Sequence, residues 1–339
     1  MEAKRIILSR TDSIGDVVLT LPMAGMIRKL LPGAEIIFLG RKYTRDVVNS
    51  SVHIDRFIDW DELDPGADHE TPEQFRQFPA DIIIHVFPVR VIAWLAQRAA
   101  IPVRIGTTGR PYHFFTCNRL VPFSRKRSRL HEAQLNMKLL KPLGLDRIPD
   151  IDEIPFLYGL ADIPALPGSL KKLVSREKFN LILHPRSKGS AREWGLKNFR
   201  ELVKILPEDE FEIFITGTGE EKTSLSRDGF FDGLPATDLT GSMTLAGLIA
   251  FINACDGLVA ASTGPLHLSA ALGKHTIGLF PPIRPMHPGR WAPLGRHAEY
   301  LVLDKECSDC RHSTECACIR DISPAMVAER LIKKATSGK

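Results

Sequence analysis

The fold of this chain is decided by Ala261-Ser262-Thr263-Gly264-Pro265-Leu266-His267-Leu268-Ser269-Ala270-Ala271-Leu272-Gly273. An apolar run at 257–260 precedes it and predicts a buried strand, after which a helix of small residues begins. Its serine and threonine are good N-cap residues, and its first glycine lets a ligand approach the backbone closely. Free N–H groups and the helix dipole favour an anion there, so the segment predicts a phosphate site beside His267. An ordinary strand–turn–helix with a buried histidine is the alternative.

Strands and helices alternate on both sides of this segment, which is typical of parallel sheets covered by helices. We expect strands at 5–9, 34–39, 56–60, 81–87, from 103, at 180–184, 212–216, near 239, at 257–261 and at 276–280. We expect helices at 16–31, 94–100, 131–143, 196–206, from 220, at 244–254, after 264 and from 324. A stretch with several prolines at 148–172 has no helical period and predicts a linker. The chain is therefore expected to form two doubly wound domains that face each other across a cleft.

Composition places the chain among globular enzymes. Its 339 residues are 44% hydrophobic and 25% charged, with a formal net charge of +5. This mildly basic balance suits an anionic substrate or a membrane surface and gives no sign of nucleic-acid binding. No apolar stretch has the length of a membrane-spanning helix, and the N-terminus reads as a strand and not as a signal peptide. We therefore expect a cytoplasmic protein.

The six cysteines fall into two groups. Two are isolated and are expected to be core residues: Cys117 and Cys255. Four crowd into one late segment: Cys307, Cys310, Cys316 and Cys318. Their spacing, C-x2-C followed by C-x-C, is not a standard zinc pattern, and C-x-C is tight for tetrahedral ligation. A structural zinc site and reduced thiols in a folded loop are both open.

A candidate general base follows the first strand, in the run Thr11-Asp12-Ser13-Ile14-Gly15-Asp16. Gly15 permits a tight turn, and Asp16 falls in the first helical turn, where N–H groups keep a carboxylate ionised and able to accept a proton. A merely favourable first-turn acid is the alternative. One glycine does not make a dinucleotide-binding fingerprint.

Two further loops of the second half carry polar groups. The loop at 184–194 has three cations with Ser and Gly, which predicts a phosphate cradle or else a solvated basic loop. The loop at 216–221 ends in two glutamates, and a carboxylate there could accept hydrogen bonds from a ribose. Both loops and the segment at 262–267 leave the carboxyl ends of strands in one sheet, so we expect them to converge.

A basic run lies in the first half and consists of Arg125, Lys126, Arg127 and Arg129, with Ser128 between them. Such runs are usually solvated surface. The alternative is contact with a phosphorylated acceptor or with anionic lipid headgroups.

Taken in order, these motifs resemble a known family. They are Ser13-Ile14-Gly15-Asp16 with Leu21-Pro22, the loop His184 to Arg192-Glu193-Trp194, Leu239-Thr240-Gly241 with Met243-Thr244-Leu245, and Ser262-Thr263-Gly264-Pro265-Leu266-His267. Together they look like the ADP-heptose:lipopolysaccharide heptosyltransferases of glycosyltransferase family 9, over nearly the whole chain.

The resemblance implies a GT-B fold of two Rossmann-like domains. Residues 1–160 would form an acceptor-binding domain and residues 173–322 a nucleotide-sugar-binding domain. The last helix, in 323–339, would pack back toward the first domain.

The resemblance also implies a role for individual residues. Asp16 matches the proposed general base. Five residues match the side of the site that binds the donor diphosphate: Arg192, Lys188, Thr263, Gly264 and His267. The carboxylate at the ribose would be Glu220 or Glu221, and Met243 would line the adenine pocket. Many members have Asp where this chain has Ser262, which leaves the sugar specificity open.

The implied reaction is inverting and independent of metal and cofactor. It moves a heptose, or a related sugar, from ADP-heptose to a phosphorylated glycolipid acceptor of the lipopolysaccharide core. Peripheral contact with the inner membrane would accompany it, and the basic run at 125–129 would bind the acceptor. Two rivals remain open: a GT-B-like sugar-nucleotide epimerase, and a homologue that binds the sugar nucleotide without catalysis.

Overall fold

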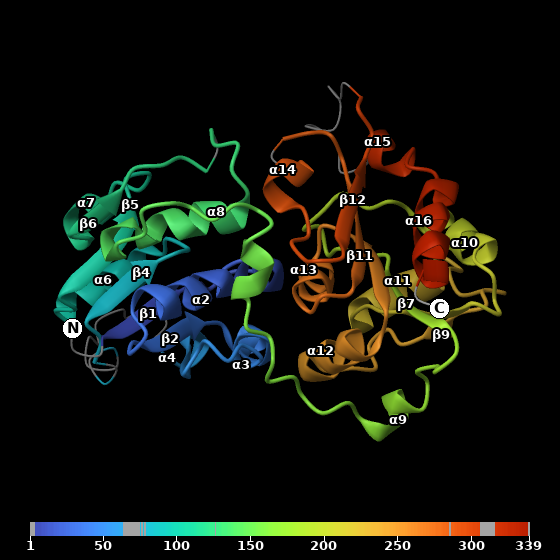
Figure 1. Ribbon diagram of the computed structural model, residues 1–339, viewed down its shortest axis with the longest axis horizontal. Coiled ribbons are helices and arrows are strands. Elements are labelled where there is room, and N and C mark those ends of the chain that lie inside the picture. The colour runs from blue at the N-terminus through green and yellow to red at the C-terminus, as the bar shows by residue number, and fades with distance from the viewer. Residues whose placement is uncertain are drawn as a thin grey trace. The chain divides into compact units, whose positions relative to one another are not determined.

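The computed structural model divides the chain into two compact units, Met1–Asp162 and Ile163–Lys339. It describes residues 4–63, 75, 77, 79–125, 127–284, 286–305 and 316–337 (Figure 1). The division falls inside the stretch at 148–172 that the sequence predicts as a linker.

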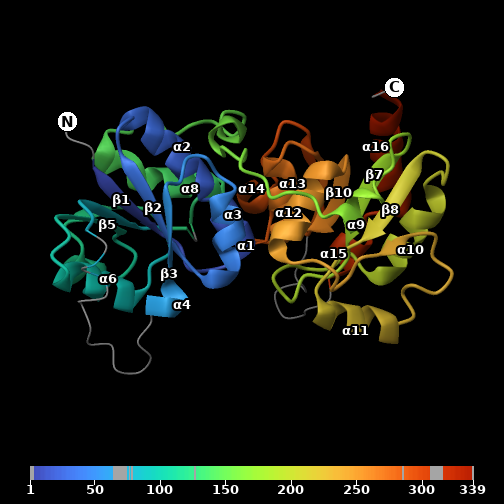
Figure 2. The ribbon, with the colours of Figure 1, turned by 90° about the horizontal axis from the view of Figure 1, so that it is seen from below.

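The first unit is built on a six-stranded parallel sheet with the order β3-β2-β1-β4-β5-β6. Its strands are β1 (Arg5–Ser9), β2 (Glu35–Gly40), β3 (Arg56–Asp59), β4 (Ile82–His85), β5 (Val103–Thr107) and β6 (Arg119–Val121). The near-continuous apolar sequences of β1, β2 and β4 are those of strands buried on both faces. Figure 2 shows α2 (Leu21–Leu30) and α8 (Glu132–Met137) on one side of the strands and α6 (Arg90–Arg98) on the other.

The remaining helices of this unit are short. They are α1 (Ile14–Val18), η1 (Lys42–Thr44), α3 (Arg45–Asn49), α4 (Trp60–Leu63), α7 (His113–Thr116), η2 (Lys138–Leu143) and η3 (Ile154–Leu157). The single helix predicted at 16–31 is instead two, α1 and α2. Pro22 lies in the first turn of α2, where its missing N–H costs nothing, and a continuous helix would have needed that donor.

The second unit repeats the same strand order, β12-β11-β10-β7-β8-β9, again all parallel. Its strands are β7 (Phe179–His184), β8 (Phe211–Ile215), β9 (Thr237–Asp238), β10 (Gly257–Ala261), β11 (His275–Phe280) and β12 (Ala298–Val302). The predicted α/β class with two doubly wound halves is therefore confirmed. Two edge strands, β6 and β12, are absent from the prediction, because each is only partly buried and has a weak apolar pattern.

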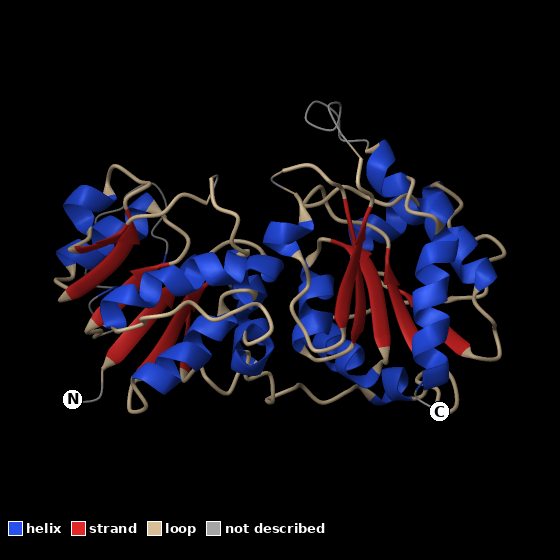
Figure 3. Cartoon of the chain, turned by 45° about the horizontal axis from the view of Figure 1, so that its top comes forward, coloured by secondary structure: helices blue, strands red, loops and turns tan. Residues whose placement is uncertain are grey.

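Helices lie on both sides of the second sheet (Figure 3). They are α9 (Gly168–Lys171), α10 (Leu196–Ile205), α11 (Gly219–Arg227), α12 (Leu245–Ala254), α13 (Gly264–Ala271), α14 (Pro288–Trp291), α15 (Ala317–Arg320) and α16 (Pro324–Ser337). No helix in the described ranges is long and apolar enough to cross a membrane.

The last helix, α16, packs against α10 within the second unit. Its Val327, Ala328 and Leu331 are fully buried and belong to the core cluster that also holds Trp194 and Phe199. Packing of this helix toward the first unit stays a prediction.

Candidate active site

In each sheet the strand order reverses between two neighbouring strands, and this position is called the switch point. Ligands of doubly wound folds bind at the carboxyl ends of these two strands. In the first unit the pair is β1 and β4, and in the second it is β7 and β10. Asp16 follows β1, the basic loop follows β7, and Ser262 follows β10. These three sequence-predicted motifs thus lie at the switch point of their own sheet, whereas the loop at 216–221 follows β8 and Met243 follows β9.

Asp16 is held by two neighbours at the start of α1. Ser13 caps this helix, and its Oγ donates a hydrogen bond to Asp16 Oδ2 at 2.6 Å. The other oxygen, Oδ1, forms an ion pair with the guanidinium of Arg10. The side chain of Asp16 keeps 19% of its surface exposed. Its carboxylate is thus oriented and still reachable by a ligand.

Arg10 lies beneath this carboxylate and is almost entirely buried. Besides Asp16 it pairs with Asp12 at 2.6 Å and with Glu132 at 3.5 Å. Burial alone would lower the pKa of Arg10, but the charges of Asp12, Asp16 and Glu132 raise it above its ordinary value. The guanidinium is therefore a permanent cation at the base of the site.

Glu132 of α8 also forms an ion pair with a second arginine. Arg125 forms an ion pair with Glu132, and it donates hydrogen bonds to Asn136 Oδ1 and to the Val86 carbonyl, each at 3.0 Å. The side chain of Glu132 is only 1% exposed. Arg125 therefore points into the protein, whereas Arg127 and Arg129 of the same run are exposed; Lys126 lies outside the described residues.

Among the described residues, three carboxylates and two guanidiniums lie in this cluster. Burial raises the pKa of Asp12 to about 6, the charge of Arg10 opposes this rise, and the charge of Asp16 adds to it. Sequence reasoning missed Arg10, Glu132 and Asn136. The signal that could have found Arg10 is an arginine directly after a buried strand.

In the second unit, hydrogen bonds and ion pairs between residues of the loop after β7 hold that loop in its conformation. Glu193 accepts hydrogen bonds from the Ser187 N–H at 2.9 Å and from Arg186 at 3.1 Å. Arg186 also pairs with Asp228 at 2.6 Å. Arg186 thus holds the conformation of the loop, which also carries Lys188 and Arg192.

Trp194 anchors the far end of this loop. Its indole N–H donates to the Ile322 carbonyl at 2.7 Å, and its ring packs edge-on against Phe199 at 4.9 Å. Arg192 lies half-buried two residues before this anchor.

Lys188 has a left-handed backbone, with φ at +48°, and its Nζ pairs with Glu220 at 2.9 Å. Both side chains are exposed, Lys188 by 51% and Glu220 by 86%. Glu221 by contrast is buried and completes a capping box with Thr218 at the start of α11. Of the two glutamates that the sequence left open for the ribose, Glu220 is therefore the accessible one.

The loops after β8 and β9 touch each other. A Cβ on Gly241, whose φ is +68°, would lie 2.9 Å from the Cα of Gly219. Met243 follows, half-buried, directly before Thr244, which caps α12. Met243 and the start of α11 therefore border the same end of the sheet.

The turn after β10 places Thr263 at the N-cap of α13. Thr263 is only 5% exposed, and its hydroxyl forms no cap bond and has no hydrogen-bond partner in the described part of the chain. The first N–H groups of a helix are also unpaired within it. His267 is buried one turn further on, and its N–H bonds the Thr263 carbonyl at 3.3 Å. This turn is suited to an anion.

The cysteine cluster is described only in part. Cys307 and Cys310 lie outside the described residues, whereas Cys316 and Cys318 are buried in the core of the second unit. Within the described ranges, no group of three or more His, Cys, Asp or Glu could hold a metal ion. The two isolated cysteines, Cys117 and Cys255, are buried as expected, and burial raises the pKa of each thiol.

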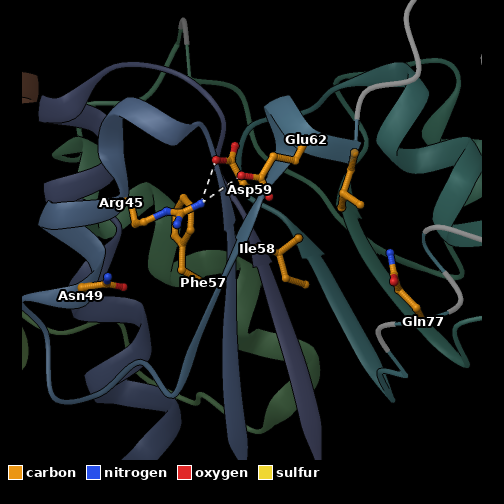
Figure 4. A pocket seen from close by; sticks show the side chains of 8 residues that line it. Arg45, Asn49, Phe57, Ile58, Asp59, Glu62 and Gln77 are labelled. Carbon is orange, nitrogen blue, oxygen red and sulfur yellow. Dashed lines mark hydrogen bonds and ion pairs between the residues drawn. The ribbon is translucent and has the colours of Figure 1, made fainter.

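A pocket of about 640 Å³ lies in the first unit, beside the edge strand β3 (Figure 4). Arg45 lies over the ring of Phe57 and pairs with Asp59 at 2.9 Å and with Glu62 at 3.6 Å. Both carboxylates thus neutralise the one cation among its described lining residues, so this pocket is not suited to a phosphate.

Comparison with known proteins agrees with this geometry. A family model for glycosyltransferase family 9 (heptosyltransferase) matches residues 72–318. The chain is 25% identical over 309 residues to a candidate glycosyltransferase of Haemophilus influenzae, with 88% of this chain and 89% of that protein covered.

Two solved structures share the fold. A family 9 glycosyltransferase from Veillonella parvula has a TM-score of 0.80 at 18% identity, covering 99% of this chain and 98% of that one. The ADP-heptose lps heptosyltransferase II of E. coli has a TM-score of 0.76 at 18% identity, with 99% of both chains covered. Because the family model matches well over half of the chain, this protein belongs to glycosyltransferase family 9 and is a glycosyltransferase.

Proposed function

We propose that this glycosyltransferase transfers a heptose from ADP-heptose to an acceptor of the lipopolysaccharide core, with inversion and without a metal ion. The E. coli protein that shares its fold bears both the donor and the lipopolysaccharide in its name. The observation that carries the proposal is the buried hydroxyl of Thr263, which lacks a partner at the start of α13. A buried polar atom without a partner costs free energy unless a ligand satisfies it.

The donor diphosphate would bind at this turn. Thr263 and the N-terminus of α13 would donate hydrogen bonds to it, and Arg192 and Lys188 would neutralise its charge. The exposed pair of Lys188 with Glu220 is worth little in water, so a diphosphate can displace Glu220 from the lysine. Glu220 is then free to accept hydrogen bonds from the ribose, and Met243 would contact the adenine.

Asp16 would be the general base. In the step, the acceptor hydroxyl oxygen forms a bond to the anomeric carbon of the heptose, and the bond from that carbon to the β-phosphate oxygen breaks. The hydroxyl proton goes to Asp16, and the bonding electron pair leaves with ADP. Attack opposite to the leaving group inverts the anomeric centre. Arg10 and Ser13 fix the carboxylate that takes the proton.

Negative charge develops on the departing ADP, and cations held in place before the reaction stabilise it most effectively. Arg192, Lys188 and the helix start can supply this stabilisation, which is why the proposal includes no metal ion.

The test incubates the protein with ADP-heptose and a delipidated lipopolysaccharide core lacking that heptose. We expect release of ADP and an acceptor heavier by one heptose in mass spectrometry. Asp16→Asn should slow the transfer by about 10²–10⁴-fold, because it removes the base, while ADP affinity stays nearly unchanged.

Arg192→Ala is the matched variant on the donor side and should weaken ADP binding. Unchanged turnover in Asp16→Asn would contradict the role of the base. Turnover of ADP-heptose without any acceptor would favour an epimerase instead.

A further inference from the structure

One segment of the first unit carries charge of a single sign. From Ile82 to His131 the chain has nine lysines and arginines and not one aspartate or glutamate. Since the whole chain has a net charge of +5, the rest carries −4. Five of the nine lie in the part up to 121, which comprises β4, α6, β5, α7 and β6, and the other four belong to the run at 125–129. These elements adjoin in the sheet and in contacts between helices. A large field of one sign attracts an oppositely charged partner.

Helix α7 presents two aromatic side chains on this half of the unit. Its His113 and Thr116, three positions apart, are buried, so Phe114 and Phe115 must point outward. Phe114 is 58% exposed and Phe115 71%, the highest value among large hydrophobic side chains in the described part of the chain. Two adjacent phenylalanines in water are unfavourable, and such exposure marks an interaction site.

Hydrogen bonds hold helix α7 in place, so its two phenylalanine rings stay exposed. His113 Nδ1 lies 2.9 Å from the Thr107 carbonyl oxygen, and Thr116 Oγ1 donates to the Tyr112 carbonyl at 2.9 Å. Gln97 of α6 donates to the Phe115 carbonyl at 2.8 Å. Figure 1 shows α7 next to β5 and β6.

Exposed arginines flank the two phenylalanines in the sequence. Arg110 and Arg119 stand four positions before and after the pair, and Arg98 follows Gln97. Burial raises the pKa of Tyr112, and the charges of Arg110 and Arg90 oppose that rise. Two exposed aromatic rings with exposed arginines on either side in the sequence match the interface of an anionic bilayer, where rings enter the headgroup layer and cations meet lipid phosphates.

We propose that α7 docks this protein onto a lipid bilayer with anionic headgroups. Phe114 and Phe115 enter the interface, and Arg90, Arg98, Arg110 and Arg119 contact the headgroups. The proposal rests on the proposed function in one respect: docking on a membrane would bring the enzyme to an acceptor that is anchored there. The proposal assigns the lipid contact to α7 and its neighbouring arginines. The sequence alone suggests the run at 125–129 instead, in which Arg125 is already paired with Glu132.

The test is sedimentation of the full-length protein with acceptor-free vesicles. One set contains phosphatidylglycerol mixed with phosphatidylcholine, and the other contains phosphatidylcholine alone. We expect binding to the anionic set, weakened by salt, and a loss of about tenfold or more in partitioning for the Phe114→Ser/Phe115→Ser variant. The matched control is Phe156→Ser, which removes a ring that is 62% exposed on η3 and should leave partitioning unchanged.

Arg110→Gln/Arg119→Gln should weaken partitioning to anionic vesicles and leave the melting temperature unchanged. Equal binding of the wild type and the double phenylalanine variant would overturn the proposal. So would a dimer that the same variant abolishes in light scattering, or preferential binding of a single-stranded oligonucleotide.

Failure of docking and failure of the proposed function are separable. The vesicles contain no acceptor, so docking is measured without any transfer. Transfer to the delipidated core should proceed at the wild-type rate in the double phenylalanine variant, because neither ring belongs to the donor or base site.

Discussion

At the residue scale, Glu132 shows how the base site depends on a buried counter-charge. Its carboxylate pairs with both Arg10 and Arg125, and it is 1% exposed. Glu132→Gln should lower the free energy of unfolding by about 3–5 kcal/mol, because it leaves two guanidiniums without their shared buried carboxylate. Urea unfolding measures the loss.

The control is Glu62→Gln, because Glu62 pairs with Arg45 while 67% exposed. An exposed ion pair contributes about 0–1 kcal/mol, so this variant should unfold nearly as the wild type does. Equal stability losses in the two variants would show that Glu132 is not the counter-charge described here.

At the hydroxyl of Thr263, one substitution can separate the effect on ADP binding from the effect on stability. Thr263→Val keeps the shape of the side chain and removes a hydroxyl that has no partner in the described part of the chain. Stability should therefore stay the same or rise, whereas ADP affinity should fall by about tenfold, the effect of losing one hydrogen bond to a charged group. Isothermal titration calorimetry and thermal unfolding measure the two quantities.

Thr116→Val is the matched control, since Thr116 is equally buried but its hydroxyl donates to the Tyr112 carbonyl at 2.9 Å. It should lose stability and keep ADP affinity. If Thr263→Val binds ADP as tightly as the wild type, the diphosphate does not contact that hydroxyl.

At the scale of elements, the central strands of the first unit carry a titratable group. His85 is the last residue of β4 and is 1% exposed. Neither of its ring nitrogens has a hydrogen-bond partner in the described ranges. Burial lowers its pKa to about 3, and the positive charges of His113 and Arg104 act in the same direction. The folded pKa is below the unfolded value of 6.5, so stability is present above pH 6.5 and is lost as the pH falls toward 3.

The free energy of unfolding of the wild type should therefore fall below pH 6.5, relative to that of His85→Leu, by up to about 1.4 kcal/mol per pH unit. Urea unfolding at a series of pH values tests this. His53→Leu, at a half-buried position, should give a smaller difference. Parallel pH profiles for the wild type and His85→Leu would refute the linkage.

The elements were predictable to the extent that they have a local pattern. Continuous apolar runs predicted β1, β4, β7 and β10, and with them the loops that carry the candidate site. The assignment of Glu221 to a capping box was readable from Thr218 and the glutamate three positions later, but the run of two glutamates made the register ambiguous. The break between α1 and α2 was readable from Pro22.

At the scale of the whole molecule, alternation of strands and helices predicts two doubly wound units but not the contacts within them. Arg10 and Glu132 are 122 residues apart, and their pairing depends on α8 packing beside α2. No local period encodes such a contact. The exposure of α7 has the same origin, since it follows from how that helix packs on β5 and α6.

The final prediction concerns the independence of the two units. Each has its own sheet and its own buried cluster, one around Ile7 and Ile83 and the other around Leu181 and Val259. The proposed donor contacts all lie in the second unit, so ADP should stabilise that unit by about 2.7 kcal/mol at a hundredfold excess over its Kd. Hydrogen exchange with mass spectrometry should show slower exchange in β7, β10 and the start of α13. It should show no change in β1 and β4. Equal protection of both units would mean that the nucleotide contacts the first unit as well, and the assignment of ADP to the second unit alone would then be wrong.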